Sequence, residues 1–250
     1  MSLPSVKGAV LIHFGISLLI FIVLAALMRW IWYPGALFSI DGGWQGLKII
    51  APIDLVLGPA LTLCFYRPWK KNVRFDMAVI ATVQIAALSY GVFAVYQQRT
   101  AAIVFAEHRF ETLSLSEYRQ ASRELKENDV QVKSLSEFST GLPVVLYASP
   151  FSGEEYGNYL ADIMNGLPEL RERSDRYMAI GDARNEIVEY RVDRQKDGTT
   201  IELSASSKPN ETDSVSAEIY TLRARYGDGT IEFDPGTFKW IDIKRDVKNE

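Results

Sequence analysis

Sulfur and imidazole are scarce in this sequence of 250 residues, which has one cysteine, Cys64, and two histidines, His13 and His108. A lone cysteine excludes an intramolecular disulfide, so cysteine usage does not report the redox compartment. Structural zinc sites take about four Cys or His ligands, which these three residues cannot supply. We therefore expect neither a metal site nor a cofactor.

Acidic residues are almost absent from residues 1–99. This part has eight Lys/Arg and three acids, Asp41, Asp54 and Asp76, for a net charge of +5. Subtracting these from the totals of 27 basic and 31 acidic residues leaves 19 and 28, a net charge of −9 for residues 100–250. A basic, apolar part followed by an acidic, mixed part indicates a membrane anchor with a water-soluble domain. The acidic part is unsuited to nucleic acid, which is bound through clustered Lys/Arg.

Catalytic signatures are missing from residues 100–250. His108 is the only histidine there, so Ser152 in SPFSGEE has no imidazole base, and the GxSxG elbow is absent. Asp213 and Asp228 lie in predicted turns without EF-hand spacing. A carboxylate pair for glycoside hydrolysis stays open, although solvated surface explains the many acids more simply. We predict that the protein is not an enzyme and has no catalytic residues.

Three apolar runs, at about 8–33, 47–66 and 77–96, are long enough to cross a membrane. The 26 residues of the first would extend ~39 Å as a helix, against a ~30 Å hydrocarbon core. A signal peptide would have a shorter apolar region and a small-residue cleavage site, whereas this run ends in bulky aromatic residues. We expect an uncleaved signal anchor. The second run contains Pro52 and Pro59, which predict a kink.

The placement of Lys and Arg predicts the orientation. The segment between the second and third runs, RPWKKNVRFD, has four Lys/Arg, whereas Lys48 is the only one at the connection between the first two. Excess Lys/Arg marks the cytoplasmic side. We therefore predict a bacterial inner-membrane protein with a cytoplasmic N-terminus, an outer 34–47 hairpin and a periplasmic domain after about residue 100. Trp30, Trp32, Tyr33 and Trp44 would then cluster at the outer interface.

Asp54 is the one acid inside an apolar run. At the centre of a membrane helix an Asp costs roughly 2.5–3.5 kcal/mol. Arg29 lies at a comparable depth below the outer end of the first run, so we predict that Arg29 and Asp54 approach each other, directly or through water. The pair could lock two helices together or form a polar docking site for a partner. A proton relay is less favoured, because there is no second intramembrane acid.

Three further residues complete the candidate docking or helix-locking set of Asp54, Arg29, Asp41, Trp44 and Gln84. Asp41 and Trp44 belong to DGGWQG (41–46), which we interpret as a tight turn with Trp44 in the headgroup region, since it does not match the Walker pattern. Gln84 is the most polar residue inside the third run. His13 is interpreted as an interfacial or helix-packing residue.

Several stretches carry a family resemblance. They are WYPGALF (32–38), DGGWQGL (41–47), D-x-V-L-G-P-x-L-T-L (54–63), F-D-x-A-V-I (75–80), Gln84, A-L-x-Y-G (87–91) and V-F-x-x-x-R-F (104–110). In this order the sequence resembles the type IV pilin accessory proteins of the TfpX/TfpZ kind over roughly residues 8–110, and more weakly beyond. It departs from their pattern at Thr100-Ala101 after Arg99, where a proline is expected.

The resemblance implies a non-enzymatic inner-membrane helper that assists a cognate type IV major pilin toward assembly, with other pilus assembly proteins as further candidate partners. No catalytic residues come with this family. The alternative is a membrane-anchored periplasmic sensor or modifying enzyme. Missing histidine chemistry, cofactor motifs and cytoplasmic domains count against it.

The pattern of residues 100–250 predicts an α+β domain with an antiparallel sheet, separate from a membrane domain of residues 1–99. We expect a strand at 102–113 that includes His108, a helix at 114–128 capped by Ser114 and Glu117, and a buried strand at 142–149. A helix at 152–165 with a Ser152/Glu155 capping box and a short helix at 168–177 would follow. Further strands are expected at 186–194, 199–206, 216–226, 230–234 and 238–244, with turns at 196–198, 207–213, 227–229 and 235–236.

Overall fold

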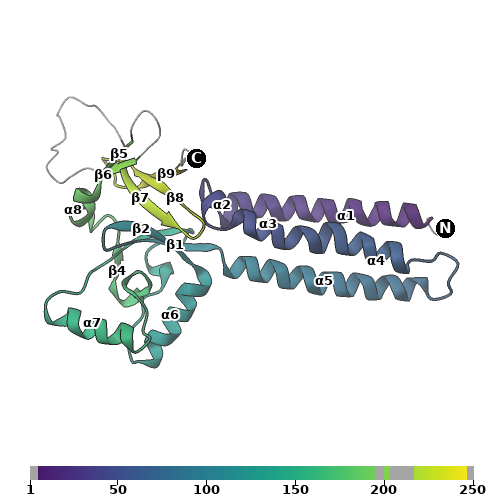
Figure 1. Cartoon of the computed structure of the whole chain (residues 1–250), viewed down its shortest axis with the longest axis horizontal. Helices are drawn as coiled ribbons and strands as arrows, with labels where there is room; N and C mark the ends of the chain where they lie inside the picture. The colour runs from purple at the N-terminus through teal and green to yellow at the C-terminus, as the bar shows by residue number, and fades with distance from the viewer. Residues whose placement is uncertain (1–4, 195–199, 203–216, 247–250) are drawn as a thin grey trace. The chain divides into compact units, whose positions relative to one another are not determined.

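The computed structural model describes residues 5–194, 200–202 and 217–246, and the chain divides into two compact units (Figure 1). The first unit comprises Met1–Trp32 and Gly43–Gln97, and the second comprises Tyr33–Gly42 and Gln98–Glu250. Residues 33–42, which connect two long helices in the sequence, therefore belong to the second unit.

The first unit consists of three long helices. The first is α1 (Val6–Leu27), continued by the π-helical η1 (Met28–Trp32). The second is α3 (Gly43–Ala51), η2 (Pro52–Leu57) and α4 (Gly58–Phe65), and the third is α5 (Val73–Gln97). All three are long and apolar enough to cross a membrane, as the sequence predicts.

The second long helix departs from the prediction at its start. It begins at Gly43, so Trp44 and Gly46 are helical and only the first residues of DGGWQG turn the chain. Gly42 makes the turn, with φ +124 that side chains rarely adopt. A kink is predicted near Pro52 and Pro59, and the structure has the π-helical η2 at this place, where proline cannot donate the helical hydrogen bond of its turn.

The second unit is built on a seven-stranded sheet in the order β4-β3-β1-β2-β7-β8-β9. Its strands are β1 (Thr100–Ala106), β2 (Arg109–Ser114), β3 (Val144–Ala148), β4 (Tyr177–Ala179), β7 (Glu218–Ala224), β8 (Gly227–Phe233) and β9 (Trp240–Arg245). The predicted α+β class is confirmed. The sheet is antiparallel except at β1–β3 and β2–β7, which pair in parallel.

Helices and a small ribbon accompany this sheet. They are α2 (Leu37–Ile40), α6 (Leu115–Glu127), α7 (Glu154–Met164), α8 (Arg184–Ile187), the 3-10 turns η3 (Leu135–Glu137), η4 (Leu170–Glu172), η5 (Ser174–Arg176) and η6 (Val188–Tyr190), and the antiparallel pair β5 (Val192–Arg194) and β6 (Thr200–Glu202). The predicted capping box of α6 is confirmed, since Ser114 and Glu117 bond each other's backbone N–H groups.

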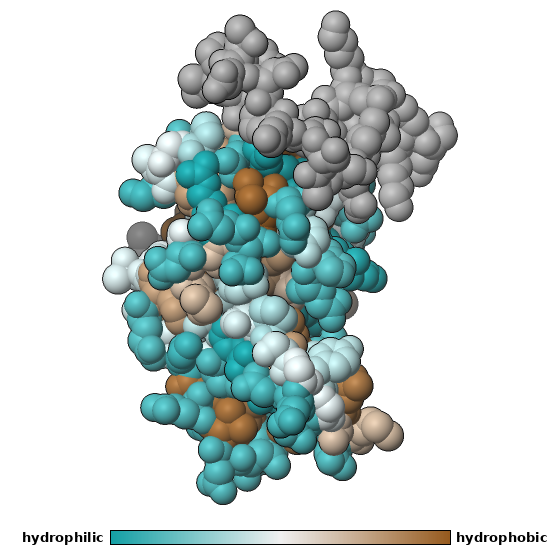
Figure 2. Space-filling view, turned by 90° about the vertical axis from the view of Figure 1, so that its left-hand side faces the viewer, coloured by the Kyte–Doolittle hydropathy of each residue, from teal (hydrophilic) through white to brown (hydrophobic). Residues whose placement is uncertain are grey.

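Aromatic side chains dominate the core of the second unit. Phe110 lies 5.1 Å from Phe105 and 5.4 Å from Phe233, measured between ring centroids, and Phe233 stacks on Phe238 at 4.8 Å. Such pairs contribute roughly 0.5–1.5 kcal/mol beyond the area they bury. The face of this unit in Figure 2 is largely hydrophilic, with separate hydrophobic side chains among the polar ones.

The single strand predicted at 102–113 is wrong, because the chain turns back after Ala106. β1 and β2 form a hairpin, and Glu107 adopts φ 61 in its two-residue turn. His108 is therefore a turn residue, stacked on Tyr190 at 5.2 Å, rather than a strand residue. The turn has no Gly or Asn, which are the usual signals for this backbone conformation.

Other local predictions need correction. Gly153, with φ 53, precedes α7, so the Ser152/Glu155 capping box does not form. Residues 168–177 make the turns η4 and η5, and residues 186–194 are mostly α8 and η6. Residues 227–229 belong to β8, and the turn lies at 225–226. The buried strand at 142–149 and the turn at 235–236 are confirmed. The turns at 196–198 and 207–213, with residues 199, 203–206 and 216 of predicted strands, lie outside the described residues.

Candidate functional site

A cluster of polar side chains lies inside the apolar first unit. It consists of His13 and Ser17 from α1, Asp54 from η2, Thr62 from α4 and Gln84 from α5. All are buried except the partly buried His13. Each of the three long helices contributes to this cluster, so it joins them at one level.

Gln84 connects the cluster. Its Nε2 donates to Ser17 Oγ and to Asp54 Oδ1, both at 3.2 Å. Its Oε1 lies 2.6 Å from His13 Nε2 and accepts from it, because an amide oxygen has no hydrogen to donate. His13 Nδ1 lies 2.6 Å from Thr62 Oγ1, which donates to the carbonyl of Gly58 at 3.1 Å. One bond network thus runs through all three helices.

Gly58 makes room for this network. A Cβ atom at position 58 would lie 2.3–2.5 Å from the Gln84 side-chain amide. No side chain could occupy that space without displacing Gln84. The glycine therefore allows the amide to lie directly against the second long helix.

Asp54 is fully buried, with one oxygen bonded and the other unbonded. Oδ1 accepts from Gln84, and Oδ2 has no hydrogen-bond partner among the described residues. An unsatisfied buried polar atom costs about 1–3 kcal/mol, and more when charged. The unbonded Asp54 oxygen therefore raises the free energy of the folded chain.

A groove of about 470 Å³ lies between α1 and α5. It forms because both helices pack on α4. Its walls are apolar, with Ile12, Ile16 and Ile20 on α1 and Ala81, Ile85 and Leu88 on α5. Its floor contains His13, Asp54 and Gln84. Chemically it can accept an apolar helix that brings a hydrogen-bond donor to Asp54.

Arg29 is not brought to Asp54, and the predicted direct pairing is wrong. Arg29 is exposed in η1, and Asp54 has no contact with it among the described interactions. Asp54 is level with Ser17, and twelve residues of helix separate Ser17 from Arg29, or ~18 Å. Part of this error in depth arises because the second helix begins at Gly43 rather than near residue 47, which places Asp54 about one turn further from the outer end. Trp44 lies in α3 and is 54% exposed.

Asp41 forms a second buried polar centre, which lies in the second unit. Thr100 and Thr112 donate to its two oxygens, the latter at 2.7 Å. Arg225 adds its Nε at 3.0 Å to Oδ1 and its Nη2 at 3.0 Å to Oδ2. Arg225 also donates to Gln98 Oε1 at 2.9 Å. Asp41 therefore ties residues 33–42 to β1, β2 and the β7–β8 turn, and both its oxygens are occupied.

The pKa of Tyr33 indicates that the Asp41 junction is shielded from water. Burial, opposed by the Arg225 charge and assisted by Asp41, raises the pKa of the Tyr33 phenol to about 12. Burial would lower the pKa of the Arg225 guanidinium, but the hydrogen bonds and charge of Asp41 outweigh it and raise the pKa. The junction thus holds a charged pair and a neutral phenol.

The sequence predictions identified two of the five cluster residues. Asp54 and Gln84 are among the predicted candidates. The sequence predicts only helix-packing or interfacial roles for His13 and Ser17, and Thr62 is not among the candidates. A signal was present, since His13 and Ser17 are four residues apart, as are Gly58 and Thr62. Small and polar residues at that spacing share one face of a helix.

The chain, with its unit of three apolar helices and its α+β unit, is similar in sequence to known proteins. The chain is 35% identical over 96 residues to the fimbrial assembly protein of serogroups C1 and C2 of Dichelobacter nodosus, covering 38% of this chain and 73% of that protein. It is 34% identical over 123 residues to the serogroup I protein of the same organism, covering 46% of this chain and 48% of the relative. The serogroup E1 protein of this organism is 32% identical over 123 residues, which again cover 46% of this chain and 48% of the relative.

These findings place the chain in the family of fimbrial assembly proteins. The chain spans about half the length of the first two of the curated relatives it matches, at 48% of each. No family profile matches the chain. No solved structure matches it.

Proposed function

We propose that this protein is a non-enzymatic accessory protein of the bacterial inner membrane that assists a cognate type IV major pilin, in the manner of the TfpX/TfpZ kind. The relatives named fimbrial assembly proteins support a role in pilus biogenesis. The pilin as partner is supported by the ordered motifs of residues 8–110. Other pilus assembly proteins are further candidate partners.

The unbonded oxygen of Asp54 carries this proposal. Asp54 lines a groove whose walls are apolar along both helices. Its Oδ2 is itself buried, so a donor from a partner reaches it only when the side chains that cover it move. Ionisable residues inside membrane helices are costly, and they commonly mark functional sites. A membrane helix of the pilin would lie between α1 and α5 and donate a hydrogen bond to Asp54 Oδ2. The small side chains of Ala9 and Ala81 would allow the close approach that helices need in lipid.

Two observations support the orientation, with the N-terminus in the cytoplasm and residues 100–250 in the periplasm. Four Lys/Arg lie in the connection between α4 and α5 and in the first turn of α5, at positions 67, 70, 71 and 74, which favours the cytoplasmic side for that end of the helices. Residues 33–42 and the chain after Gln97 belong to one compact unit. A single unit on the outer side is what three spans with a cytoplasmic N-terminus require.

Co-purification of the detergent-solubilised protein with the pilin tests the proposal. We expect wild-type protein to recover pilin, and Asp54→Leu and Asp54→Asn to recover at least tenfold less at equal protein levels. Thr82→Val is a matched control, because Thr82 is exposed on α5 and bonds only the carbonyl of Ala78. Equal recovery by the Asp54 variants would refute docking at Asp54, and absence of pilin from the wild type would refute the function. A deletion strain should also display fewer surface pili.

A further inference from the structure

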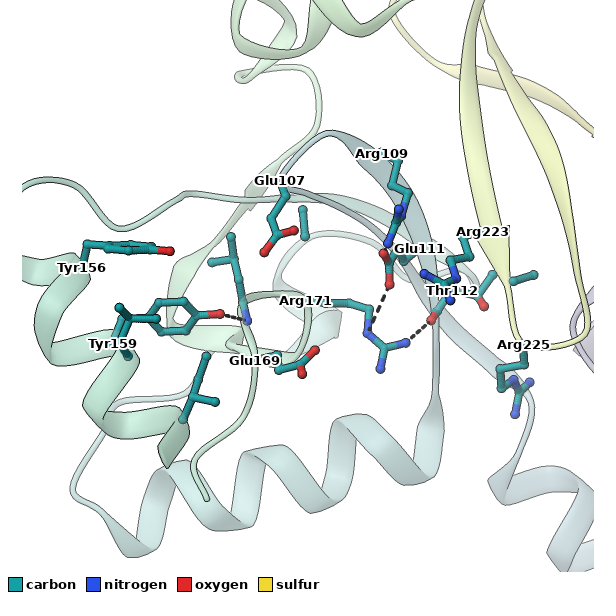
Figure 3. A pocket seen from close by; sticks show the side chains of 15 residues that line it. Glu107, Arg109, Glu111, Thr112, Tyr156, Tyr159, Glu169, Arg171, Arg223 and Arg225 are labelled. Carbon is teal, nitrogen blue, oxygen red and sulfur yellow. Dashed lines mark hydrogen bonds and ion pairs between the residues drawn. The ribbon is translucent and has the colours of Figure 1, made fainter. Parts of the chain in front are cut away.

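The second unit has a polar groove of about 560 Å³ whose charges are balanced within the fold (Figure 3). Most of its arginines are paired, in the ion pairs Arg109–Glu111, Arg171–Glu172 and Arg225–Asp41. Glu107 and Glu169, which also line the groove, offset the remaining Arg223. The described lining of this groove therefore has no excess of positive charge that would select an anionic ligand.

One end of the first unit has a different balance of charge. It is formed by the start of α1 and the connection between α4 and α5 (Figure 1). Ala9, Tyr66 and Val73 are buried against one another there, and Val6 packs on them. This apolar contact holds the first turn of α1, with the exposed Lys7, beside the connection.

Most of the positive charge at this end is not cancelled by acids. Residues 66–77 contain four Lys/Arg and one acid, Asp76, for a net charge of +3. Asp76 pairs with Lys70 at 2.6 Å, and Arg67 donates to two neutral backbone carbonyls at the end of α4. Lys71 and Arg74 are exposed and have no ion pair with any residue that the structure describes. The uncompensated charges therefore belong to Arg67, Lys71 and Arg74.

An apolar groove of about 340 Å³ begins at the same connection and lies between α4 and α5. Lys70 and Asp76 line it at the connection, and the rest of its lining is apolar, namely Leu61, Phe65, Phe75, Val79, Ile80 and Val83. Phe65 and Phe75 are 57% and 69% exposed, so the groove is open to what surrounds the helices. It shares none of its described lining residues with the groove between α1 and α5.

Trp69 indicates the depth of this groove in a membrane. It lies in the α4–α5 connection, next to Lys70, and is 76% exposed. Tryptophan is enriched at the membrane–water interface, where its ring lies at the level of the lipid headgroups. The basic connection would then meet the headgroups, and the apolar groove would extend from them into the hydrocarbon region.

A phospholipid joins the same two chemistries, an apolar acyl chain and a polar headgroup with a phosphate. Clusters of Lys/Arg next to membrane helices attract anionic lipids, and basic pockets between such helices bind their headgroups. A zwitterionic headgroup has no net charge, so it would leave the +3 of residues 66–77 uncompensated. The charge at this end therefore favours an anionic headgroup over a zwitterionic one.

We propose that the groove between α4 and α5 binds an anionic phospholipid. One acyl chain lies along Phe75 and Val79, and the phosphate is held at the basic connection, where Lys71 and Arg74 are available. The inference goes beyond the proposed function, because this lipid needs no pilin and leaves the groove between α1 and α5 open.

Native mass spectrometry of the full-length protein tests the preference for negative charge. The detergent-solubilised protein is equilibrated with equal amounts of phosphatidylglycerol, which is anionic, and phosphatidylethanolamine, which is zwitterionic, with identical acyl chains. We expect at least fivefold more bound phosphatidylglycerol. The double variant Lys71→Gln/Arg74→Gln should lose this preference. Lys48→Gln/Arg123→Gln is the matched control, because it removes two exposed charges that do not line the groove.

Equal binding of the two lipids by the wild type would mean ordinary surrounding lipid only and would overturn the inference. An equal loss in both double variants would show an effect of total charge and would overturn it as well. No pilin takes part in this experiment, so its failure would leave the proposed function standing.

Filling the groove tests where the acyl chain lies. Val79→Phe should lower the bound phosphatidylglycerol at least threefold, because the ring occupies the groove that Val79 lines. Ala78→Phe is the control, since Ala78 is exposed on α5 and does not line the groove. Circular dichroism checks that each variant is folded, and Val83→Phe replaces Val79→Phe if the latter is not. Unchanged lipid binding in the folded variant, or an equal loss in Ala78→Phe, would overturn the inference.

Discussion

Two aspartates in the described part of the chain, Asp41 and Asp54, are completely buried, and they are bonded very differently. Asp41, in the second unit, accepts hydrogen bonds on both oxygens from two threonines and an arginine. Asp54, in the first unit, accepts one bond from Gln84 and has one oxygen without a partner in the described part of the chain. Burial alone therefore does not reveal the role of an acid. The number of carboxylate oxygens that accept hydrogen bonds distinguishes Asp41, which stabilises the fold, from Asp54, which has an oxygen left for a partner.

The difference follows from what surrounds each residue. Asp41 lies where β2 and β7 pair over only two residues, so groups from β1, β2 and the β7–β8 turn can converge on it. Asp54 has one hydrogen-bond partner among the described residues, the uncharged amide of Gln84, and this amide also bonds Ser17 and His13. A paired, hydrogen-bonded charge is tolerated in a protein interior, whereas an incompletely bonded one raises the free energy of the folded chain.

The largest effect is expected from Asp41→Ala. The substitution leaves Arg225 without its carboxylate, and removing one partner of a buried pair costs about 3–5 kcal/mol. Thermal unfolding of the detergent-solubilised protein, followed by circular dichroism, should show the loss. Asp182→Ala, at an exposed position of the second unit, should change little. Equal stability of the two variants would remove the distinction between Asp41 and Asp54.

A smaller effect is expected at alkaline pH, through Tyr33. The ordinary pKa of 10.0 is raised to about 12 in the folded protein. Below pH 10 the Tyr33 phenol keeps its proton in the folded and in the unfolded protein, and its contribution to stability is fully present. Between pH 10 and about 12 the phenol ionises in the unfolded protein first, so the free energy of unfolding falls as the pH rises. The loss would reach about 2–3 kcal/mol.

Denaturant unfolding at about pH 9 and about pH 11 measures roughly half of this loss, because pH 11 lies midway between the two pKa values. Tyr33→Phe should be less sensitive to that change than wild type, because the variant lacks the titrating group. The comparison of the two proteins cancels the contribution of the other tyrosines. An identical pH response in wild type and variant would contradict the dry Asp41 junction.

Gly58→Ala should cost about 1–3 kcal/mol, the usual range for overpacking a core. The new methyl group would displace the Gln84 amide and break its bonds to His13, Ser17 and Asp54. Gly15→Ala is the control, since its Cβ would meet nothing within 4 Å. Unfolding in detergent would compare the two. If both alanine variants were equally stable, the cluster would not join the three helices.

The smallest effect on stability is expected from Asp54→Asn, within about 1 kcal/mol of wild type. Asparagine keeps the oxygen that accepts from Gln84 and changes only the atom that has no partner. The same change at Asp41 should be strongly destabilising. Parallel unfolding of Asp41→Asn and Asp54→Asn is therefore the sharpest test of the comparison. A large loss for Asp54→Asn would make Asp54 a structural residue.

Much of the first unit could be predicted from the sequence, because long apolar helices are specified locally by hydropathy. The partner of Asp54 could not, because it depends on where the helix that carries Asp54 starts. That helix starts four residues, or about one turn, earlier than predicted, which moves Asp54 away from Arg29 and toward Ser17. In the second unit the capping box of α6 is local and was predicted. The parallel β2–β7 pairing joins residues more than a hundred positions apart and left no local signal.

The membership of residues 33–42 in the second unit has a practical consequence for dissecting the protein. A secreted fragment that starts at Gln98 would lack α2, which packs on β8 and β9, as well as the carboxylate that Arg225 requires. Isolating the second unit therefore requires that residues 33–42 be joined ahead of β1 by a short linker or added as a separate peptide. The folding unit is assembled from two separate stretches of sequence, and a cut at the end of the third helix divides it.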